Sequence, residues 1–273
     1  MNPIRLTIIT ICYNDRVGFE RTAKSIIDQS YQRFEWIIVD GASTDGSVDS
    51  IKSTVESLRE CESPIILHWK SEPDKGIYNA MNKGISQAHG QYCLFMNSGD
   101  YFYTNDVVEK VLPLLKGIDI YIGDIYHSDE IGVHQFQNSD FTIEGTLNRL
   151  ASLSYPHQGS FIKTDLLNRF GGYREDLRIV SDWYFYYNAI IYNMATIEFI
   201  PMVIAVFDRN GVSSNAGLKL KEERDKSLSG NPYLFLLYDF YSQNYRMLSI
   251  IKKSKIGFFI YRIAFYFARK TNR

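Results

Sequence analysis

Residues 95–100 read Phe95-Met96-Asn97-Ser98-Gly99-Asp100, an apolar segment that ends in a short polar turn with one carboxylate at its tip. Three segments upstream have the same form. The apolar runs 6–13, 36–39 and 65–69 are of strand length, and each is followed by polar and glycine residues and then by a helix-like segment. Because ligands bind at the carboxyl ends of the strands in an open parallel sheet, we expect the four polar clusters to meet along one edge.

The order of the segments predicts an α/β fold. Helix-like patterns cover residues 19–29, 46–58 and 77–88, between the strand-like runs. This alternation favours a mostly parallel sheet with right-handed crossovers. The later elements are expected as follows: a helix at 106–115 capped by Thr104 or Asn105, strands at 118–122 (ending at Gly123-Asp124), 156–162 and 201–207, a helix capped by Ser181, and a loop or solvated helix at 213–229.

The composition is that of a globular protein. The 273 residues suffice for one large domain with an appendage, and 45% of them are hydrophobic. A net charge of −1 gives no electrostatic reason to expect a nucleic-acid partner. The three cysteines and five histidines show no metal-ligand spacing, and an odd number of cysteines argues for a reducing compartment. Residues 1–5 run straight into strand-like sequence, so we expect no signal peptide and a cytoplasmic location.

The character of the chain changes near residue 229, which divides an expected main domain, 1–228, from a tail, 229–273. From Tyr245 onward the sequence has eight Lys and Arg residues and no Asp or Glu, with aromatic and aliphatic residues between them. A spanning helix needs about 20 apolar residues, and Arg262 interrupts the shorter apolar run 256–268. We therefore expect the tail to lie on the inner face of an anionic membrane. The alternative is a helix that packs on the main domain or on a second copy of the chain, which would make a homo-oligomer.

Candidate ligand-binding residues lie at the strand ends. Asp40 could accept a hydrogen bond from a nucleobase or a ribose hydroxyl, or it could only shape its turn. Asp74 and Lys75 precede a helix whose free N–H groups could face phosphate, although N-terminal capping explains the pattern as well. Asp100, with Asn97 as a weaker contact, could hold a divalent cation, and a tight turn is the alternative.

Two later positions are candidates for chemistry. Asp182 stands at an expected helix start, where it could be a general base or could stabilise the helix dipole. His157 is a lone histidine before a strand-like segment, and its side chain could be structural or functional.

Taken together, in this order and at this spacing, these segments resemble family 2 glycosyltransferases with the GT-A fold, above all the bacterial enzymes that build capsule, exopolysaccharide or O-antigen units. The resemblance covers residues 4–210 and rests on six segments: Thr10–Asn14, Val39–Ser47, Asp74–Asn79, Met96–Asp100, His157-Gln158 and Ser181–Trp183. It implies a Rossmann-like, mostly parallel sheet flanked by helices, here with a C-terminal helical tail. It also implies an inverting transfer from a nucleoside-diphosphate sugar to a glycan or lipid-linked acceptor.

The resemblance assigns roles by position. Thr10 and Tyr13 would border the nucleotide, and Asp40 would contact its base. Asp100 would hold Mg²⁺ or Mn²⁺ on the donor diphosphate, and Asp182 would be the general base. Three further residues are candidate contacts to the donor or acceptor, namely Asn97, His157 and Trp183.

Two departures from the family pattern leave alternatives open. The family's Asp-Ser-Asp-Asp run is here Asn97-Ser98-Gly99-Asp100, and its Glu-Asp pair is Ser181-Asp182. A non-catalytic scaffold that only binds nucleotide sugars therefore remains an alternative. A sugar-phosphate nucleotidyltransferase or a nicotinamide oxidoreductase would need a glycine-rich loop where Cys12-Tyr13-Asn14-Asp15 stands.

Overall fold

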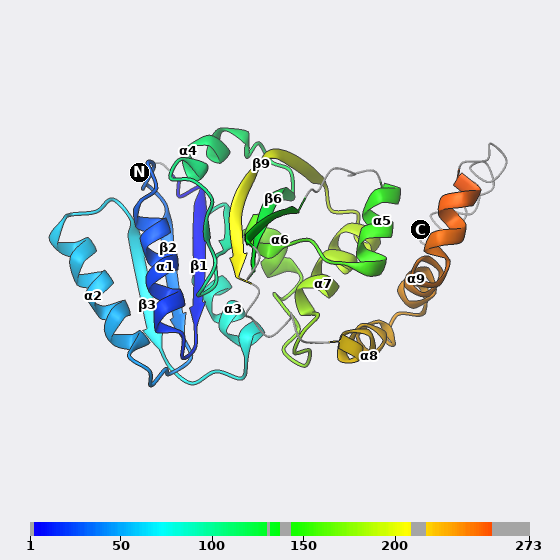
Figure 1. Ribbon diagram of the computed structural model, residues 1–273, viewed down its shortest axis with the longest axis horizontal. Helices are drawn as coiled ribbons and strands as arrows, with labels where there is room; N and C mark the ends of the chain where they lie inside the picture. Colours follow the sequence, from blue (N-terminus) through cyan, green and yellow to red (C-terminus); the bar gives the residue numbers. More distant parts are fainter. Residues whose placement is uncertain (1–2, 130–131, 137–142, 209–216, 253–273) are drawn as a thin grey trace.

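The computed structural model describes residues 3–129, 132–136, 143–208 and 217–252. One twisted sheet runs through the molecule, with strand order β3-β2-β1-β4-β8-β6-β9-β5 and with β7 paired to β6 (Figure 1). The first four strands are parallel, as the sequence predicts. Their bounds are Leu6–Cys12 (β1), Glu35–Asp40 (β2), Ile66–Ser71 (β3) and Tyr92–Phe95 (β4).

The second half of the sheet is mixed. β8 (Ser160–Lys163) is antiparallel to both β4 and β6 (Ile120–Asp129), whereas β9 (Ile197–Asp208) is parallel to β6. β5 (Tyr101–Phe102) pairs antiparallel with β9, and β7 (Gly132–Phe136) forms a hairpin with β6. The pairing of β5 with β9 brings the end of β9 to the turn that follows β4.

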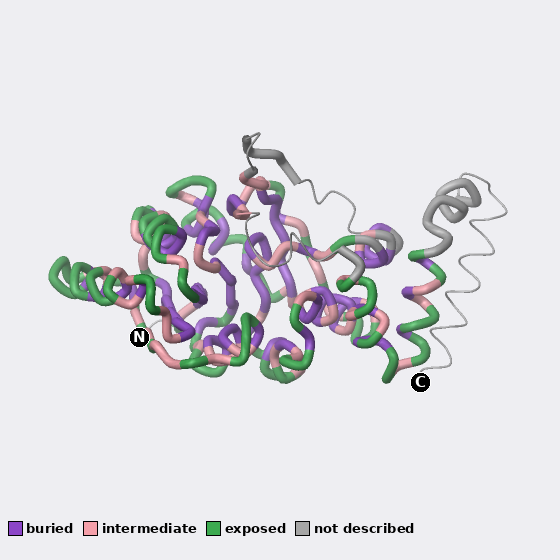
Figure 2. The backbone as a smooth tube through the Cα atoms, turned by 60° about the horizontal axis from the view of Figure 1, so that its bottom comes forward, coloured by how far each residue is buried: buried purple, intermediate pink, exposed green. Residues whose placement is uncertain are grey.

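Both faces of β1, β2 and β4 are covered, so these strands are buried along their whole length, whereas β3 at the edge of the sheet is exposed or half-buried. Leu6 and Ile8 face α1 (Arg16–Ile27), α2 (Ser47–Glu60) and α4 (Val107–Val111), which is followed by a 3₁₀ turn, Leu112–Leu114. Ile9 and Ile11 face the other core, formed with α3 (Ile77–Ile85), α6 (Thr164–Arg169) and α7 (Ser181–Tyr186), which continues as a π-type turn, Tyr187–Tyr192. Buried residues are concentrated in the interior of the molecule, as Figure 2 shows, and every residue of β1 is among the buried ones.

Three helices lie beyond the second half of the sheet. They are α5 (Ile143–Ser152), α8 (Gly217–Leu228) and α9 (Pro232–Lys252), and α9 lies at the opposite end of the molecule from α2 (Figure 1). Leu234 and Tyr238 of α9 are buried in the core of α3 and α7. Tyr233 and Leu236 of the same helix are about two-thirds exposed. The part of the tail that the structure describes is therefore a helix packed on the main domain by one face, with apolar side chains on the other.

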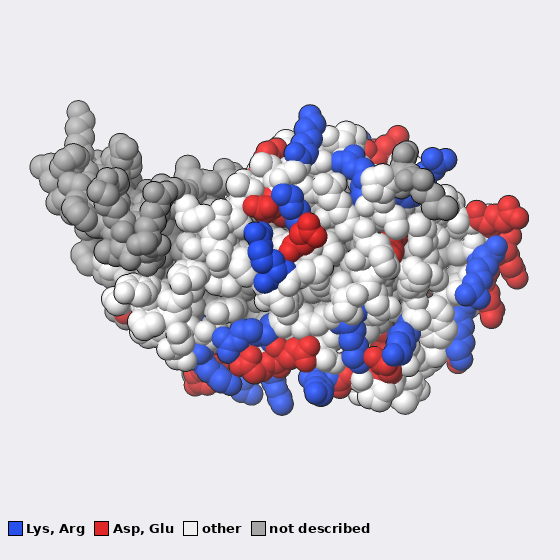
Figure 3. All heavy atoms as spheres, turned by 180° about the vertical axis from the view of Figure 1, so that it is seen from behind, with Lys and Arg blue, Asp and Glu red and all other residues white. Residues whose placement is uncertain are grey.

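The predicted tail continues beyond the described residues, because 253–273 lie outside them. The boundary at residue 229 stays a prediction. Among the helices that the structure describes, none combines the length and the apolar character needed to cross a bilayer. Acidic and basic side chains are interspersed on the face drawn in Figure 3.

Both predicted helix caps were wrong. α4 is capped at Asp106, not at Thr104 or Asn105, and the Thr104 hydroxyl instead donates to the Asp106 carboxylate. α7 has Val180 at its N-cap, and Ser181 is already helical. The backbone N–H groups of the three residues just before α7, Arg178, Ile179 and Val180, donate to the Glu223 carboxylate of α8.

Some strand and helix limits also differ from the expectation. β6 does not end at Gly123-Asp124 but runs to Asp129, because a bulge there shifts its register with β9 and lets the pairing continue. Of the polar segment 213–229, residues 217–228 form α8, and the rest before it lies outside the described residues. Leu228 and Arg224 of α8 are buried, so only one side of this helix is solvated.

Candidate functional site

The ends of the first four strands meet, as the sequence predicts. Cys12 is in register with Asp40, and Asp40 with Ser71, so the loops after β1, β2 and β3 leave the sheet at the same edge. The turn after β4 joins them, because the Ser98 N–H donates to the carbonyl of Ile11.

Asp40 is fully buried and organises the loop that follows it. Its carboxylate accepts hydrogen bonds from the Ser43 backbone N–H (3.0 Å), the Ser43 hydroxyl (2.5 Å) and the Ser71 hydroxyl (2.6 Å). The Ser43 hydroxyl in turn accepts from the backbone N–H of Asn14 (2.8 Å). Asp40 thus fixes the loops after β1, β2 and β3 relative to one another, and its contact with a base stays a prediction.

Tyr13 and Asp74 lie together over the backbone of Gly41. A Cβ atom at Gly41 would be 2.5 Å from Oδ2 of Asp74 and 2.9 Å from the Tyr13 ring. Tyr13 is 66% exposed, and Lys75 is also exposed. Asp74 accepts from the Gly76 N–H (2.8 Å) at the start of α3. An exposed aromatic ring, a carboxylate and a lysine therefore line this part of the edge.

Two candidates are not brought to this surface. Thr10 is fully buried and accepts a hydrogen bond from the indole N–H of Trp36 (3.0 Å). Trp183 is 1% exposed, and its indole N–H donates to the Leu150 carbonyl (2.6 Å). Both side chains belong to the core.

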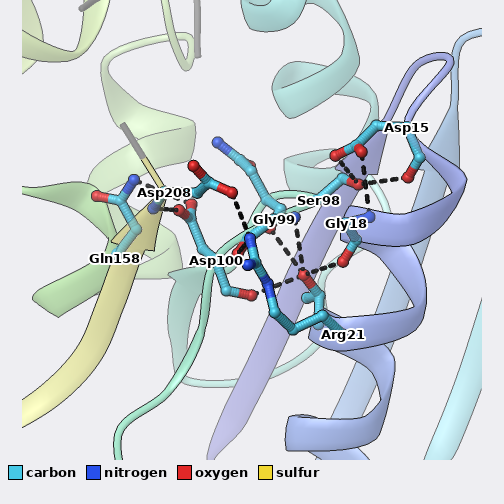
Figure 4. Close-up of polar contacts among 10 residues, drawn as sticks. Asp15, Gly18, Arg21, Ser98, Gly99, Asp100, Gln158 and Asp208 are labelled. Atoms are coloured by element: carbon cyan, nitrogen blue, oxygen red, sulfur yellow. Dashed lines mark hydrogen bonds and ion pairs between the residues drawn. The ribbon is translucent and has the colours of Figure 1, made fainter. Parts of the chain in front are cut away.

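The turn after β4 is tied to three other parts of the chain (Figure 4). Asp100 is 3% exposed, and its carboxylate accepts from the backbone N–H of Asp208 (3.0 Å) and the side-chain amide of Gln158 (3.0 Å). Burial raises the pKa of the Asp100 carboxyl to about 6. Arg21 of α1 donates to the Gly99 carbonyl (2.5 Å) and forms an ion pair with the Asp208 carboxylate.

The backbone conformation and the close neighbours of residue 99 both favour glycine at this position. Its φ of +98° lies in a region that side chains disfavour. A Cβ there would be 3.3 Å from Cβ of Asp208 and 3.4 Å from its Oδ2. The carboxylate of Asp208, at the end of β9, thus lies against the position at which the family run carries a further aspartate.

The oxygen donors around this turn fit a divalent cation. Oδ1 of Asn97 is buried and has no hydrogen-bond partner among the described residues. Asp100 and Asp208 add carboxylates, and Mg²⁺ often takes only one or two protein carboxylates together with substrate phosphates. No group of three or more His, Cys, Asp or Glu side chains in the described part of the chain is arranged to hold a metal alone. The metal expectation therefore stays a prediction, and the cation would depend on phosphate oxygens from a ligand.

A second group of residues connects the turn to α7. Nε2 of His157 lies 3.0 Å from the side-chain amide of Asn97, and its Nδ1 lies 3.6 Å from Oδ2 of Asp182. The Tyr78 hydroxyl of α3 donates to Oδ1 of Asp182 (3.0 Å) and to the Ile179 carbonyl (2.8 Å). Asp182 is thus a partly exposed carboxylate, 18% by side chain, held beside the polar turn.

Sequence reasoning brought together Asn97, His157 and Asp182 but missed four residues of the site. Tyr78 lies within the segment Asp74–Asn79 and Gln158 within the segment His157-Gln158, so the family resemblance already pointed to the parts of the chain that contain them. No motif in the sequence marked Arg21 or Asp208. Asp208 is brought to the turn by the pairing of β5 with β9, which lie far apart in the sequence.

The chain is similar in sequence to known glycosyltransferases. The sequence profile described as glycosyl transferase family 2 matches residues 7–178. The chain is 34% identical over 217 residues to an uncharacterized glycosyltransferase of Mycobacterium tuberculosis, with 77% of each chain covered. It is 27% identical over 197 residues to a PGL/p-HBAD biosynthesis glycosyltransferase of Mycobacterium bovis, covering 70% of this chain and 72% of that one.

The fold is also similar to solved structures. Residues 1–349 of S. aureus TarS, in complex with UDP-GlcNAc, match with a TM-score of 0.66 at 19% identity, covering 87% of this chain and 73% of that one. The mannosyltransferase PcManGT of Pyrobaculum calidifontis, in complex with GDP-Man and Mn²⁺, matches with a TM-score of 0.58 at 15% identity, covering 98% and 83%. At these identities the likeness shows the fold, and the GT-A expectation is confirmed.

Proposed function

The chain belongs to glycosyl transferase family 2, and from this premise we propose that it transfers a sugar from a nucleoside-diphosphate sugar to a hydroxyl of a glycan or lipid-linked acceptor, with inversion at the anomeric carbon. The observation that carries the proposal is the position of Asp182. Its carboxylate is partly exposed, and His157 lies between it and the turn at the end of β4. The proposed base and the proposed donor-binding edge would thus lie next to each other.

The donor nucleotide is proposed to lie on the loops after β1, β2 and β3. Tyr13 offers an exposed ring to the base, and Asp40 holds the surrounding loops in place and is the proposed contact to the base. Asp74 lies beside Tyr13, and Lys75 at the start of α3 offers a positive charge to the diphosphate. Bound there, the donor directs its sugar toward the turn at 97–100 and toward Asp182.

The transfer is proposed as a single displacement. Asp182 removes the proton from the acceptor hydroxyl while that oxygen attacks the anomeric carbon from the side opposite the diphosphate. The bond from carbon to the diphosphate oxygen breaks, and its electron pair leaves on the nucleoside diphosphate. A divalent cation held by Asp100 and Asp208 would supply positive charge for that leaving group.

His157 and Asn97 are proposed to border the sugar between the two sites. Nε2 of His157 contacts the side-chain amide of Asn97, and Nδ1 faces Asp182. The proposed tautomer of His157 is the one with the proton on Nδ1. This arrangement places a hydrogen-bond donor beside the base without removing its charge. Trp183 is in the core and supports α7 rather than contacting a substrate.

The acceptor is proposed to belong to bacterial cell-surface glycan synthesis, and the support is that a relative named above is a PGL/p-HBAD biosynthesis glycosyltransferase. Capsule, exopolysaccharide and O-antigen units remain the proposed products. A lipid-linked acceptor also agrees with the proposed contact of the tail with the inner face of an anionic membrane.

The membrane proposal rests on the exposed face of α9 and on the sequence that follows it. Tyr233, Leu236 and Phe240 are exposed on this helix, and the sequence after residue 245 is basic and aromatic. Aromatic side chains and Lys or Arg together are typical of interfacial helices. Co-sedimentation with anionic vesicles at low salt tests it: the full chain should pellet, and a chain ending at Lys252, which keeps the buried Leu234 and Tyr238, should pellet less. Association of the full chain into dimers without pelleting would support a homo-oligomer instead.

A thermal-shift screen tests the proposed function. Nucleoside diphosphates and nucleotide sugars are added with and without Mn²⁺, and a ligand that binds the folded chain raises the midpoint by mass action. At least one nucleotide should stabilise the protein, and a chain that no nucleotide stabilises would contradict the proposal. The alternative function, a non-catalytic scaffold that binds nucleotide sugars, is suggested by the absence of carboxylates at Asn97 and Gly99. It predicts the same stabilisation but no turnover of any donor.

A further inference from the structure

Tyr78 connects the proposed base to the donor side of the site. It is the second residue of α3, follows the Asp74–Gly76 loop and is 6% exposed. Its hydroxyl proton is shared between the Ile179 carbonyl (2.8 Å) and Oδ1 of Asp182 (3.0 Å). One buried hydroxyl therefore contacts both the backbone before α7 and the carboxylate in the first turn of α7.

We propose that Tyr78 is a positioning residue for the transfer: it holds Oδ1 of Asp182, so that Oδ2 is the oxygen that receives the acceptor proton. This inference rests on the proposed role of Asp182 as the base. Oδ2 lies 3.6 Å from Nδ1 of His157, which is longer than a hydrogen bond. The hydroxyl of Tyr78 is accordingly the contact that sets the rotation of the carboxylate.

The start of α7 needs such a contact from outside. Val180, at its N-cap, makes no side-chain capping hydrogen bond to the described residues. Instead, the Glu223 carboxylate of α8 accepts from the backbone N–H groups of Arg178 (2.8 Å), Ile179 (2.8 Å) and Val180 (3.1 Å). Glu223 fixes the backbone on one side, and Tyr78 fixes the carbonyl and the carboxylate on the other.

The hydroxyl of Tyr78 can act only as a donor to Asp182. Burial, followed by the nearby negative charge of Asp182, raises the pKa of this phenol well above its ordinary value. It stays protonated across the working range of an enzyme. A hydrogen bond donated to a carboxylate is roughly twice as strong as one between neutral groups, so the ionised form of Asp182 is the form that Tyr78 stabilises.

Several titratable or charged groups face Asp182 and must be counted in a pH experiment. They are Tyr78 of α3, His157 of the turn at 157–159, Tyr173 of the loop before α7, Tyr186 of α7 and Arg224 of α8. Burial raises the pKa values of all three tyrosines, so none of them ionises near neutral pH. Removing only the hydroxyl of Tyr78 leaves the other four groups in place.

The test compares Tyr78→Phe with Tyr92→Phe. Tyr92 is also fully buried, and its hydroxyl donates to a backbone carbonyl, that of Ile118 (3.0 Å), at the opposite end of β4 from the site. Both variants lose one buried hydroxyl. The readouts are the midpoint of thermal unfolding, kcat for donor turnover against pH, and the Kd for the nucleoside diphosphate that stabilises the wild type.

Tyr78→Phe should lower kcat at least tenfold with the nucleotide Kd changed less than twofold. The acid limb of its kcat profile should move to higher pH, because ionised Asp182 loses a stabilising donor. Tyr92→Phe should keep the wild-type kcat and acid limb. Equal kcat and equal acid limbs in the two variants would overturn the inference.

Three other outcomes are informative. If Tyr78→Phe does not fold, difluorotyrosine placed at position 78 keeps the hydroxyl and makes it a stronger donor, so the acid limb should move to lower pH; an unmoved limb would overturn the inference. If Asp182→Asn retains turnover, the proposed function of Asp182 is wrong and this inference is wrong with it. Loss of turnover in Asp182→Asn together with a wild-type profile in Tyr78→Phe would reject the inference alone.

Discussion

Asp182→Asn separates the proposed chemistry from the proposed binding. The change replaces one carboxylate oxygen by an amide nitrogen and keeps the shape of the side chain. The remaining oxygen can still accept from the Tyr78 hydroxyl, now 3.0 Å from Oδ1 of Asp182. The loops around Tyr13 and Asp40 share no hydrogen bond with Asp182 among those described, so the nucleotide site should be unchanged.

The expected loss follows from the role of the group. A positioned general base contributes about 10²–10⁴-fold to a rate, which corresponds to about 3–5 kcal/mol in the activation barrier. The stability cost should be small, because the contact that changes, from Oδ2 to Nδ1 of His157, is 3.6 Å long. A loss of about 1 kcal/mol or less in the free energy of unfolding is expected.

The assay measures nucleoside-diphosphate release at saturating donor and donor binding by calorimetry, for the wild type and for Asp182→Asn. Turnover should fall at least a hundredfold while the donor Kd stays within about twofold. The reasoning is refuted if the variant turns over within threefold of the wild-type rate. Parallel loss of binding and turnover would also refute it, because the residue would then belong to the donor site.

Three further predictions concern the metal, acid stability and packing. Asp100→Ala should weaken Mn²⁺-dependent binding of the nucleoside diphosphate at least tenfold more than binding of the bare nucleoside; calorimetry showing equal losses would remove the metal role. Burial raises the pKa of Glu35, but hydrogen bonds, chiefly from His89, outweigh it and hold the pKa below its usual range. Ionised Glu35 therefore stabilises the fold above a pH of about 4.3, the ordinary pKa of a Glu side chain. This stabilisation is lost as the pH falls through the lower pKa of the folded state. Glu35→Gln should therefore make the melting temperature fall less steeply in acid, and an unchanged fall would contradict the assignment. Gly90→Ala would place a Cβ 2.5 Å from a backbone nitrogen of β1, so denaturant unfolding should show a loss of about 1–3 kcal/mol, whereas Gly230→Ala, which meets no described atom within 4 Å, should leave stability unchanged.

The parallel half of the sheet was predictable from the sequence because its signals are local. The sequence shows a short apolar run near each strand, and a turn and a helix follow each of β1, β2 and β3. The register that unites Cys12, Asp40 and Ser71 at one edge then follows from the parallel pairing. The resemblance to a family named Asn97, His157 and Asp182 as candidate site residues, and the structure places their side chains beside one another.

The second half could not be derived in the same way, because its pairings are long-range. The bulge at Gly123-Asp124 resembles a strand end in the sequence, and only the pairing with β9 shows that the strand continues. Glu223 likewise holds the backbone before α7 through contacts across more than forty residues. Asp208 reaches the turn at Gly99 through the pairing of β5 with β9.

The expected roles of Thr10 and Trp183 show a different limit. Both stand inside segments that match the family, yet a residue in such a segment can face the core. The alternation along β1 places the Thr10 side chain toward Trp36 rather than toward the edge. The first turn of α7 likewise places Trp183 inside and Asp182 outside.

Donor turnover is the most direct measurement of the central claim. The full chain, with Mn²⁺, is incubated with UDP-, GDP- and dTDP-sugars, and the released nucleoside diphosphate is measured with and without a lipid extract as a source of acceptor. We expect release from at least one donor, faster with the extract, and no release above background from Asp182→Asn. Binding of a nucleotide without release from any donor, or equal release by the wild type and Asp182→Asn, would contradict the account.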